Sequence, residues 1–280
     1  MSEPHIFGPK VLLEGTSGSG KTHAIGTIVD WAAKNGKEVF VLFTENGLET
    51  LLGYWKDASK PIPQNLHYHN TMTRPLKLTS LMDAADKVGK LTYESVTKMS
   101  DANRGGDNNA FYKILTACND FPDDLSGKKF GPVDLWGTDK IFVIDSLSEL
   151  ANACMKMVIG NKPTASMPDY GVAQNCLMNF IRLCTQGCSC TFIMTAHVSR
   201  EKDEITGGIK LMTSAIGGAI SGIIPQLFSD VIYTTREGGS FYWDTANASV
   251  DVKTRNLPIA AKQAPDLGRI MDKWASRQQS

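Results

Sequence analysis

The residues with the most evident chemistry form a glycine-rich segment near the start of the chain. It follows the spacing G-x-x-x-x-G-K-[ST] at every fixed position. Backbone amides of such a segment, at the start of a helix, point at phosphate oxygens, and glycines let the backbone approach them closely. The lysine would reach the β- and γ-phosphates, and the threonine would ligate Mg²⁺. The segment therefore predicts binding of ATP and Mg²⁺ by Gly15, Thr16, Ser17, Gly18, Ser19, Gly20, Lys21 and Thr22.

Two carboxylates follow apolar runs, where they could complete such a site. Asp145 ends the run 141–144, and the carboxyl ends of buried parallel strands are where ligands bind in open α/β sheets. We expect Asp145 to hold Mg²⁺ opposite Thr22, in preference to capping the helix that follows. Glu45 lies just past the run 39–43. It could orient the attacking water, or it could be a solvated loop acid; its position alone does not separate the two.

Three further side chains are weaker candidates. His197 follows the run 190–196 and could hydrogen-bond the γ-phosphate, or could cap the end of a strand. Lys253 and Arg255 alternate, so both would point the same way from a strand. They could neutralise the γ-phosphate of a neighbouring subunit, but their spacing alone favours two solvated cations on an edge strand.

The elements that must position these residues indicate an α/β fold. The runs 11–14, 39–43, 141–144 and 190–196 are apolar on both faces, which suits buried strands of a mainly parallel sheet covered by helices. The stretch 56–138 is less regular, and we expect it to be an insertion in a single domain spanning 1–280. A C-terminal antiparallel extension is predicted by Gly238-Gly239 between two strand-like runs. The other expected elements are helices at 21–34, 77–90, 107–119, 147–158, 170–186 and 266–275, and strands at 66–69, 230–235, 240–243 and 250–255.

Composition restricts the partners and the cellular location that we expect for this protein. The 29 basic and 29 acidic residues cancel, so any contact with nucleic acid must come from local loops. Residues 198–222 could form such a loop, or a flexible polar loop without a partner. No apolar run is long enough to span a bilayer, and the start lacks a secretory pattern. The six cysteines lie mostly in apolar stretches and read as reduced, buried thiols, so we expect a cytoplasmic protein without a membrane partner.

At these positions the chain resembles the RecA-like ATPases, and among them the phage-encoded Sak-type proteins of single-strand annealing and recombination. The resemblance implies a RecA-like core in which Glu45 is the catalytic glutamate and His197 senses the γ-phosphate. It also implies that Lys253 and Arg255 act across a subunit interface, and that residues 159–168 and 198–222 correspond to two DNA-binding loops. The segments that carry it are 15–22, 43–46, 142–146, 195–197 with 206–208, and, more loosely, 252–255.

The function implied by this resemblance is ATP hydrolysis coupled to single-stranded DNA in phage recombination or annealing. The expected partners are single-stranded DNA, further copies of the chain sharing sites between subunits, and a single-strand-binding protein, in the cytoplasm of a bacterial host. The alternatives are a ring-forming helicase or a helicase or partner loader of DNA replication, and a nucleotide switch without DNA. A GTPase is disfavoured because Asn161-Lys162-Pro163-Thr164 lacks the aspartate that would complete a guanine-reading motif.

Overall fold

The structure is a computed structural model that describes residues 6–71, 78–79, 82, 86, 89–90, 110–160, 164–202 and 209–278. Its centre is a seven-stranded sheet in the order β3-β2-β4-β5-β1-β8-β9. The first six of these strands run parallel, and β9 is antiparallel to β8. The strands are β1 (Lys10–Gly15), β2 (Glu38–Phe43), β3 (Leu66–Asn70), β4 (Lys140–Asp145), β5 (Thr191–Ala196), β8 (Asp230–Glu237) and β9 (Ser240–Asp244).

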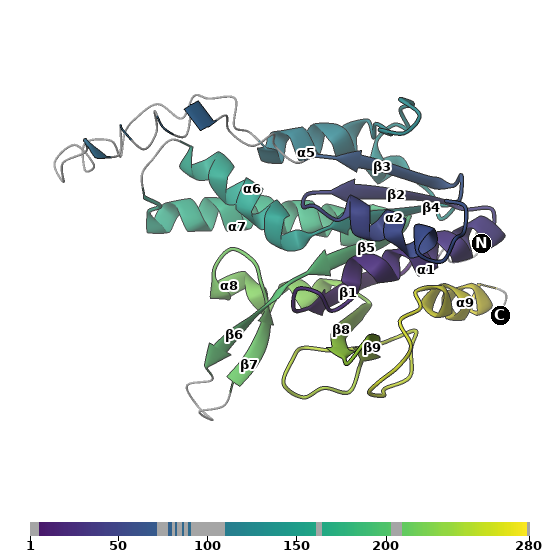
Figure 1. Cartoon of the computed structure of the whole chain (residues 1–280). Helices are drawn as coiled ribbons and strands as arrows, with labels where there is room; N and C mark the ends of the chain where they lie inside the picture. Colours follow the sequence, from purple (N-terminus) through teal and green to yellow (C-terminus); the bar gives the residue numbers. More distant parts are fainter. Residues whose placement is uncertain are drawn as a thin grey trace, which may run out of the picture.

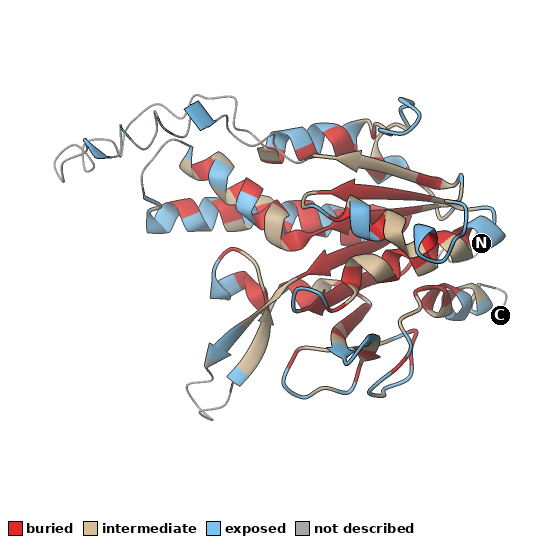
Figure 2. Ribbon diagram, viewed as in Figure 1, coloured by how far each residue is buried: buried red, intermediate tan, exposed pale blue. Residues whose placement is uncertain are grey.

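Helices cover both faces of this sheet, which explains why its central strands β1, β2, β4 and β5 are mostly apolar. Alternate side chains of β2 belong to different core clusters: Phe40 and Leu42 pack on one face, Val39 and Val41 on the other. These four central strands are accordingly buried over almost their whole length (Figure 2). One face carries α5 (Ala110–Asn119), α6 (Leu147–Ile159) and α7 (Met167–Arg182), and the other α1 (Lys21–Lys34), α2 (Leu48–Lys56) and α9 (Gly268–Ser276), as Figure 1 shows.

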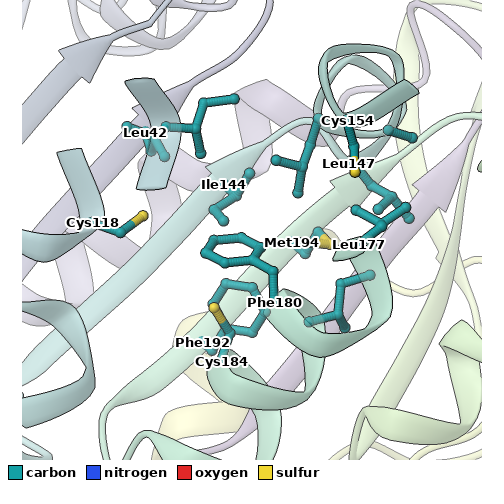
Figure 3. Packing of buried hydrophobic residues seen from close by; sticks show 14 of the residues in the cluster. Leu42, Cys118, Ile144, Leu147, Cys154, Leu177, Phe180, Cys184, Phe192 and Met194 are labelled. Carbon is teal, nitrogen blue, oxygen red and sulfur yellow. The ribbon is translucent and has the colours of Figure 1, made fainter. Parts of the chain in front are cut away.

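The core on the α5–α7 side is built from branched and aromatic side chains with several sulfurs among them. Phe192 stacks between Phe142 and Phe228, with ring centroids 5.7 and 5.9 Å apart. All six cysteines are free, and five of them are buried. Figure 3 shows the packing of Leu42, Ile144, Phe192 and Met194 from the sheet against Leu147, Leu177 and Phe180 from the helices, with Cys118, Cys154 and Cys184 among them.

Most of the expected elements are confirmed, including the mainly parallel α/β fold and its antiparallel extension. The helix 21–34 has the predicted bounds: Gly20 precedes it with φ 91°, and Gly36 follows it with φ 62°. The hairpin at Gly238-Gly239 joins β8 and β9, with Gly238 at φ 59°. The helix expected at 170–186 begins earlier, at Met167, because Ser166 and Asp169 form a capping box there. Its last turn, Leu183–Gly187, is a π-helix, and 3₁₀ turns span Val133–Leu135 and Ile224–Leu227.

Two expectations differ from the structure. The segment 198–222 is not simply a loop: β6 (Val198–Lys202) and β7 (Ile209–Thr213) form an antiparallel pair, the β6–β7 ribbon, and α8 (Gly218–Ser221) follows. The ribbon extends from the end of β5 away from the sheet (Figure 1). The segment 250–255 forms isolated bridges to Leu211 and Val231 in place of a strand. Both histidines of β3 have acidic partners, since His67 contacts Asp123 and His69 contacts Asp124.

The irregular stretch is only partly described. The helix expected at 77–90 falls mostly outside the described residues. Within the stretch, β3 extends the main sheet and α5 packs on α6, so both belong to the same layers as the rest of the fold. The assignment of 56–138 as an insertion in one domain stays a prediction. Among the described residues, no helix is both long and apolar enough to cross a membrane.

Candidate nucleotide-binding site

The glycine-rich segment links the end of β1 to the start of α1 and rests on β8. A Cβ atom at Gly15 would lie 2.3 Å from the hydroxyl oxygen of Thr234, so only glycine allows this approach. The same hydroxyl lies 2.6 Å from the Ser19 hydroxyl. The segment is therefore anchored at both its start and its middle to the neighbouring strand.

The end of the segment packs against the β8–β9 hairpin. Gly20 has φ 91°, and a Cβ atom there would lie 2.6 Å from Cγ of Phe241. The Phe241 ring also lies beside His23, with centroids 5.4 Å apart, and the Arg236 guanidinium lies 5.8 Å from the Phe241 centroid. Sequence reasoning missed all three of these side chains. Glu45 and Asp145 were predicted because they lie at the carboxyl ends of strands. The same criterion would have found Arg236, but only once β8 is known to lie beside β1.

A cavity of about 450 Å³ opens in front of the segment. Its size lies within the range of ligand-binding pockets in proteins. Carboxylate, imidazole, guanidinium and aromatic groups from four different elements converge on it. It is lined by Ser17–His23, Glu45, Asn46, Thr50, His197, Arg236 and Phe241.

Lys21 is the cation at the base of this cavity. Its Nζ atom donates hydrogen bonds to the carbonyl oxygens of Gly15 and Thr16, at 2.9 and 2.8 Å. Burial lowers the pKa of Lys21 to about 8, against the opposing effect of the charges of Asp145 and Glu45. A buried ammonium that has only carbonyl acceptors is well suited to receive a phosphate oxygen.

Thr22 and Asp145 meet as expected of a magnesium site. The Thr22 hydroxyl donates to Oδ2 of Asp145 at 2.8 Å, and the Thr195 hydroxyl donates to Oδ1. Burial is the main reason that the pKa of Asp145 is raised, so its ionised form would gain from a cation. Hydroxyl and carboxylate oxygens are ligands that Mg²⁺ prefers, so this pair fits that ion. The N-cap residue of α6 is Ser146, which leaves the Asp145 carboxylate facing Thr22.

Glu45 and His197 both line the cavity and contact each other. Nε2 of His197 lies 3.4 Å from Oε2 of Glu45. The hydrogen bond from His197 is the main reason that the pKa of Glu45 is lowered, so this carboxylate is ionised at neutral pH. The His197 backbone accepts a hydrogen bond from Ser214 N at 2.8 Å and donates one to the Ser148 hydroxyl at 3.2 Å. A group at the phosphate cavity is thus joined to the base of the β6–β7 ribbon, where β6 starts and β7 ends.

The structure does not bring Lys253 and Arg255 to this cavity. Lys253 bridges Val231 near the start of β8, and its Nζ atom donates to the Gln226 carbonyl at 3.0 Å. Arg255 lines a different cavity, at the amino edge of the sheet. Because the glycine-rich segment lies at the carboxyl edge, neither cation can act on a nucleotide in its own chain. Their action across a subunit interface stays a prediction, and Arg236 is the arginine that lines the nucleotide cavity.

The comparison with protein families agrees with this geometry. A family profile described as AAA domain matches residues 8–256, which include the whole site. The chain is also similar in structure to a prototypical ATPase from the type III secretion system of pathogenic bacteria, with 16% sequence identity and a TM-score of 0.40. That similarity covers 82% of this chain and 53% of the ATPase, so the chain spans about half of that protein. No curated protein matches the chain.

Proposed function

The chain belongs to the AAA domain family of P-loop ATPases, and on that premise we propose that it hydrolyses ATP and couples hydrolysis to binding of single-stranded DNA. The observation that carries the coupling is the 3.4 Å contact between Glu45 and His197. It joins Glu45, the carboxylate that would orient the attacking water, to the residue directly before β6. A RecA-like recombination or annealing role of the phage Sak type is the specific form of this proposal.

The catalytic part of the proposal assigns one role to each side chain in the cavity. Lys21 and the backbone amides of residues 15–22 bind the phosphates, and Glu45 orients the attacking water. Thr22 and Asp145 would hold Mg²⁺, which when bound neutralises charge on the phosphates. Arg236, which also lines the cavity, would neutralise charge on the phosphates. Phe241 offers the cavity an aromatic face on which a base could stack.

The coupling part rests on the hydrogen bonds of His197. A γ-phosphate in the cavity would compete with Glu45 for the imidazole of His197, because both are anionic acceptors. The backbone of His197 is hydrogen-bonded to Ser148 on α6 and to Ser214 beyond β7, so a shift of His197 would displace both residues. A ligand changes an equilibrium only by binding its two states differently, and this contact supplies the difference.

The surface of the ribbon supports contact with nucleic acid. Arg200 is paired with Leu211 and Lys202 with Ile209, and cross-strand partners share a face of a two-stranded sheet. That face therefore carries the Arg200 cation beside two apolar side chains, Leu211 and Ile209, and Ile209 is 64% exposed. Cations beside apolar groups are what a single strand needs for its phosphates and bases.

The proposal is tested by titrating the ATPase with single- and double-stranded DNA. We expect single-stranded DNA to raise kcat several-fold, and Lys21→Ala to abolish hydrolysis with and without DNA. The double variant Arg200→Ala/Lys202→Ala should lower the degree of stimulation. Its matched control is Lys113→Ala/Lys128→Ala, which removes the same charge from the α5 side of the molecule.

The outcomes separate this proposal from its alternatives. A rate that does not depend on DNA at any concentration would favour a nucleotide switch. ATP-dependent strand separation by closed oligomers would favour a ring helicase, and stimulation by a replication protein in place of DNA would favour a loader. Homo-oligomers with sites shared between subunits belong to the proposal, and sedimentation with and without ATP tests that part.

A further inference from the structure

A buried hydroxyl group without a hydrogen bond lies at the end of β4. It belongs to Ser146, which directly follows Asp145, the last residue of that strand. Ser146 is fully buried, and its Oγ atom has no hydrogen-bond partner among the residues that the structure describes. A buried polar group left unpaired costs free energy, and such groups are rare in native proteins. The hydroxyl is therefore a candidate for a role in the chemistry of the neighbouring nucleotide cavity.

This hydroxyl does not serve the helix that it precedes. Ser146 is the N-cap residue of α6, with φ −134° and ψ 170°, the extended conformation that is usual for that position. A serine hydroxyl at an N-cap ordinarily accepts a hydrogen bond from an N–H group of the first helical turn, which stabilises the helix. The Ser146 hydroxyl makes no such bond. Helix capping therefore does not explain the serine, and its hydroxyl is available to another acceptor.

The backbone of Ser146 is fixed to the segment that carries Glu45. The Thr44 hydroxyl donates to the Ser146 carbonyl oxygen and accepts from the Ser146 N–H group, both at 2.8 Å. The N–H groups of Thr44 and Glu45 both donate to the Asp145 carbonyl oxygen, at 2.8 and 3.3 Å. These hydrogen bonds join the end of β2 to the end of β4. Ser146 is thus held beside Glu45, and only its side chain is free to rotate.

The Glu45 carboxylate has room for a further donor. Within the described part of the chain its one hydrogen bond comes from His197, at 3.4 Å, whereas a strong hydrogen bond to a carboxylate is about 2.7–2.9 Å long. That bond is the main reason that the pKa of Glu45 is lowered, and the Ser146 hydroxyl adds a smaller effect in the same direction. The hydroxyl therefore lies close to the carboxylate, although it does not yet form a hydrogen bond with it.

We propose that Ser146 is a positioning residue, whose hydroxyl becomes the hydrogen-bond donor to Glu45 when ATP draws His197 to the γ-phosphate. The proposal rests on the ATP hydrolysis and the competition for His197 proposed above. Once His197 has left, the half-buried carboxylate needs a new donor, and a rotation of the serine side chain to another staggered position supplies it. The same rotation gives the buried hydroxyl its missing partner. Glu45 is then held in one orientation, which it needs in order to orient the attacking water.

The test compares Ser146→Ala with wild type in the full chain. The substitution removes a hydroxyl that has no hydrogen bond before ATP binds, so the Tm without nucleotide should equal or exceed that of wild type. We expect kcat to fall about ten-fold or more and KM to change less than two-fold, since a hydrogen bond to a charged group is lost only after ATP has bound. Thr185→Ala removes a buried hydroxyl at the amino edge of the sheet and should leave both constants unchanged.

Binding of a transition-state analogue gives a readout that does not depend on turnover. ADP with aluminium fluoride imitates the phosphoryl group during its transfer, whereas ADP alone has nothing to draw His197 away from Glu45. Isothermal titration calorimetry should therefore show about ten-fold weaker binding of ADP with aluminium fluoride to Ser146→Ala, and unchanged binding of ADP. In a Glu45→Gln background, Ser146→Ala should weaken the analogue no further, because the serine acts through the carboxylate.

The outcomes separate failure of this proposal from failure of the proposed function. Wild-type protein that hydrolyses no ATP would overturn both. Active wild type with an equally active Ser146→Ala would overturn the role of the serine alone. A Tm several degrees below wild type, with ADP and the analogue weakened alike, would show that the serine supports the fold. An equal loss of analogue affinity in the wild-type and Glu45→Gln backgrounds would show that Ser146 does not act through Glu45, and would also overturn the proposal.

Discussion

At the scale of single residues, Glu14 combines full burial with incomplete pairing. It precedes the glycine-rich segment on β1, and its Oε2 atom accepts a hydrogen bond from Thr213 at the end of β7, at 2.7 Å. Its Oε1 atom is buried without a partner among the described residues. Burial raises the pKa of Glu14 from 4.5 to about 7, with the hydrogen bond from Thr213 acting against it. A carboxyl group with such a pKa is protonated in the folded chain at pH values where the unfolded chain ionises it.

This gives stability a predictable dependence on pH. Below pH 4.5 Glu14 is protonated in both the folded and the unfolded state, so its ionisation does not affect the free energy of unfolding. Between pH 4.5 and 7 only the unfolded state loses the proton, so the free energy of unfolding falls, by about 3 kcal/mol in total. Glu14→Gln can still accept the Thr213 hydrogen bond but cannot ionise. We therefore expect the difference in unfolding free energy between variant and wild type to shift in favour of the variant as pH rises from 5 to 8.

Urea unfolding at several pH values measures that difference directly. The glutamine amide can lower the free energy of unfolding by a fixed amount, but that amount is the same at every pH. The informative quantity is therefore the slope of the difference in unfolding free energy against pH. Glu49→Gln, at an exposed position of α2, serves as the control and should give a flat difference. A flat difference for Glu14→Gln as well would mean that Glu14 is already ionised at pH 5 in the folded chain.

At the scale of elements, the β8–β9 hairpin does more than extend the sheet. It brings Phe241 against Gly20 and beside His23, at the open side of the nucleotide cavity. Stacking of a base on an aromatic ring is worth about 1–3 kcal/mol. We expect Phe241→Ala to raise the KM for ATP by roughly 5- to 100-fold, with a much smaller change for Phe241→Tyr.

Inhibition by tripolyphosphate distinguishes stacking from damage to the glycine-rich segment. Tripolyphosphate has the phosphates of ATP but no base, so its inhibition constant should be the same in Phe241→Ala and wild type. Equal weakening of ATP and tripolyphosphate would show that the phenylalanine supports Gly20 and contributes nothing to the base.

Elements also show where sequence reasoning succeeded and where it failed. The helix 21–34 and the buried strands were predictable because their signals are local: glycines at both ends of the helix, and apolar runs in the strands. The β6–β7 ribbon was missed because the alternation in Val198–Lys202 is polar and charged, and the strand is paired only with β7. Arg236 was missed for a different reason, since its place at the cavity depends on the order of the strands.

At the scale of the whole molecule, the order of the strands is what makes the site. Residues separated by more than 200 positions meet because β1 lies between β5 and β8, with β4 next to β5. The carboxyl ends of five strands (β1, β2, β4, β5 and β8) thereby supply Lys21, Glu45, Asp145, His197 and Arg236. The antiparallel bridge between Lys253 and Val231, near the start of β8, carries Arg255 to the opposite edge. No local pattern in the sequence contains this information, because it arises from which strands pair.

A ligand held by so many strands should stabilise the fold as a unit. At about 100 times its Kd, a ligand that binds only the folded state adds about 2.7 kcal/mol, which for a chain of this size raises Tm by roughly 5 °C or more. We expect ATP with Mg²⁺ to produce such a shift in a single transition, and ATP with EDTA a smaller one, because Thr22 and Asp145 are then left without their ion. Lys21→Ala should remove most of the shift while keeping the Tm of the ligand-free protein within a few degrees of wild type. Differential scanning calorimetry measures all of these, and an equal shift in Lys21→Ala would mean that ATP binds somewhere other than the end of β1.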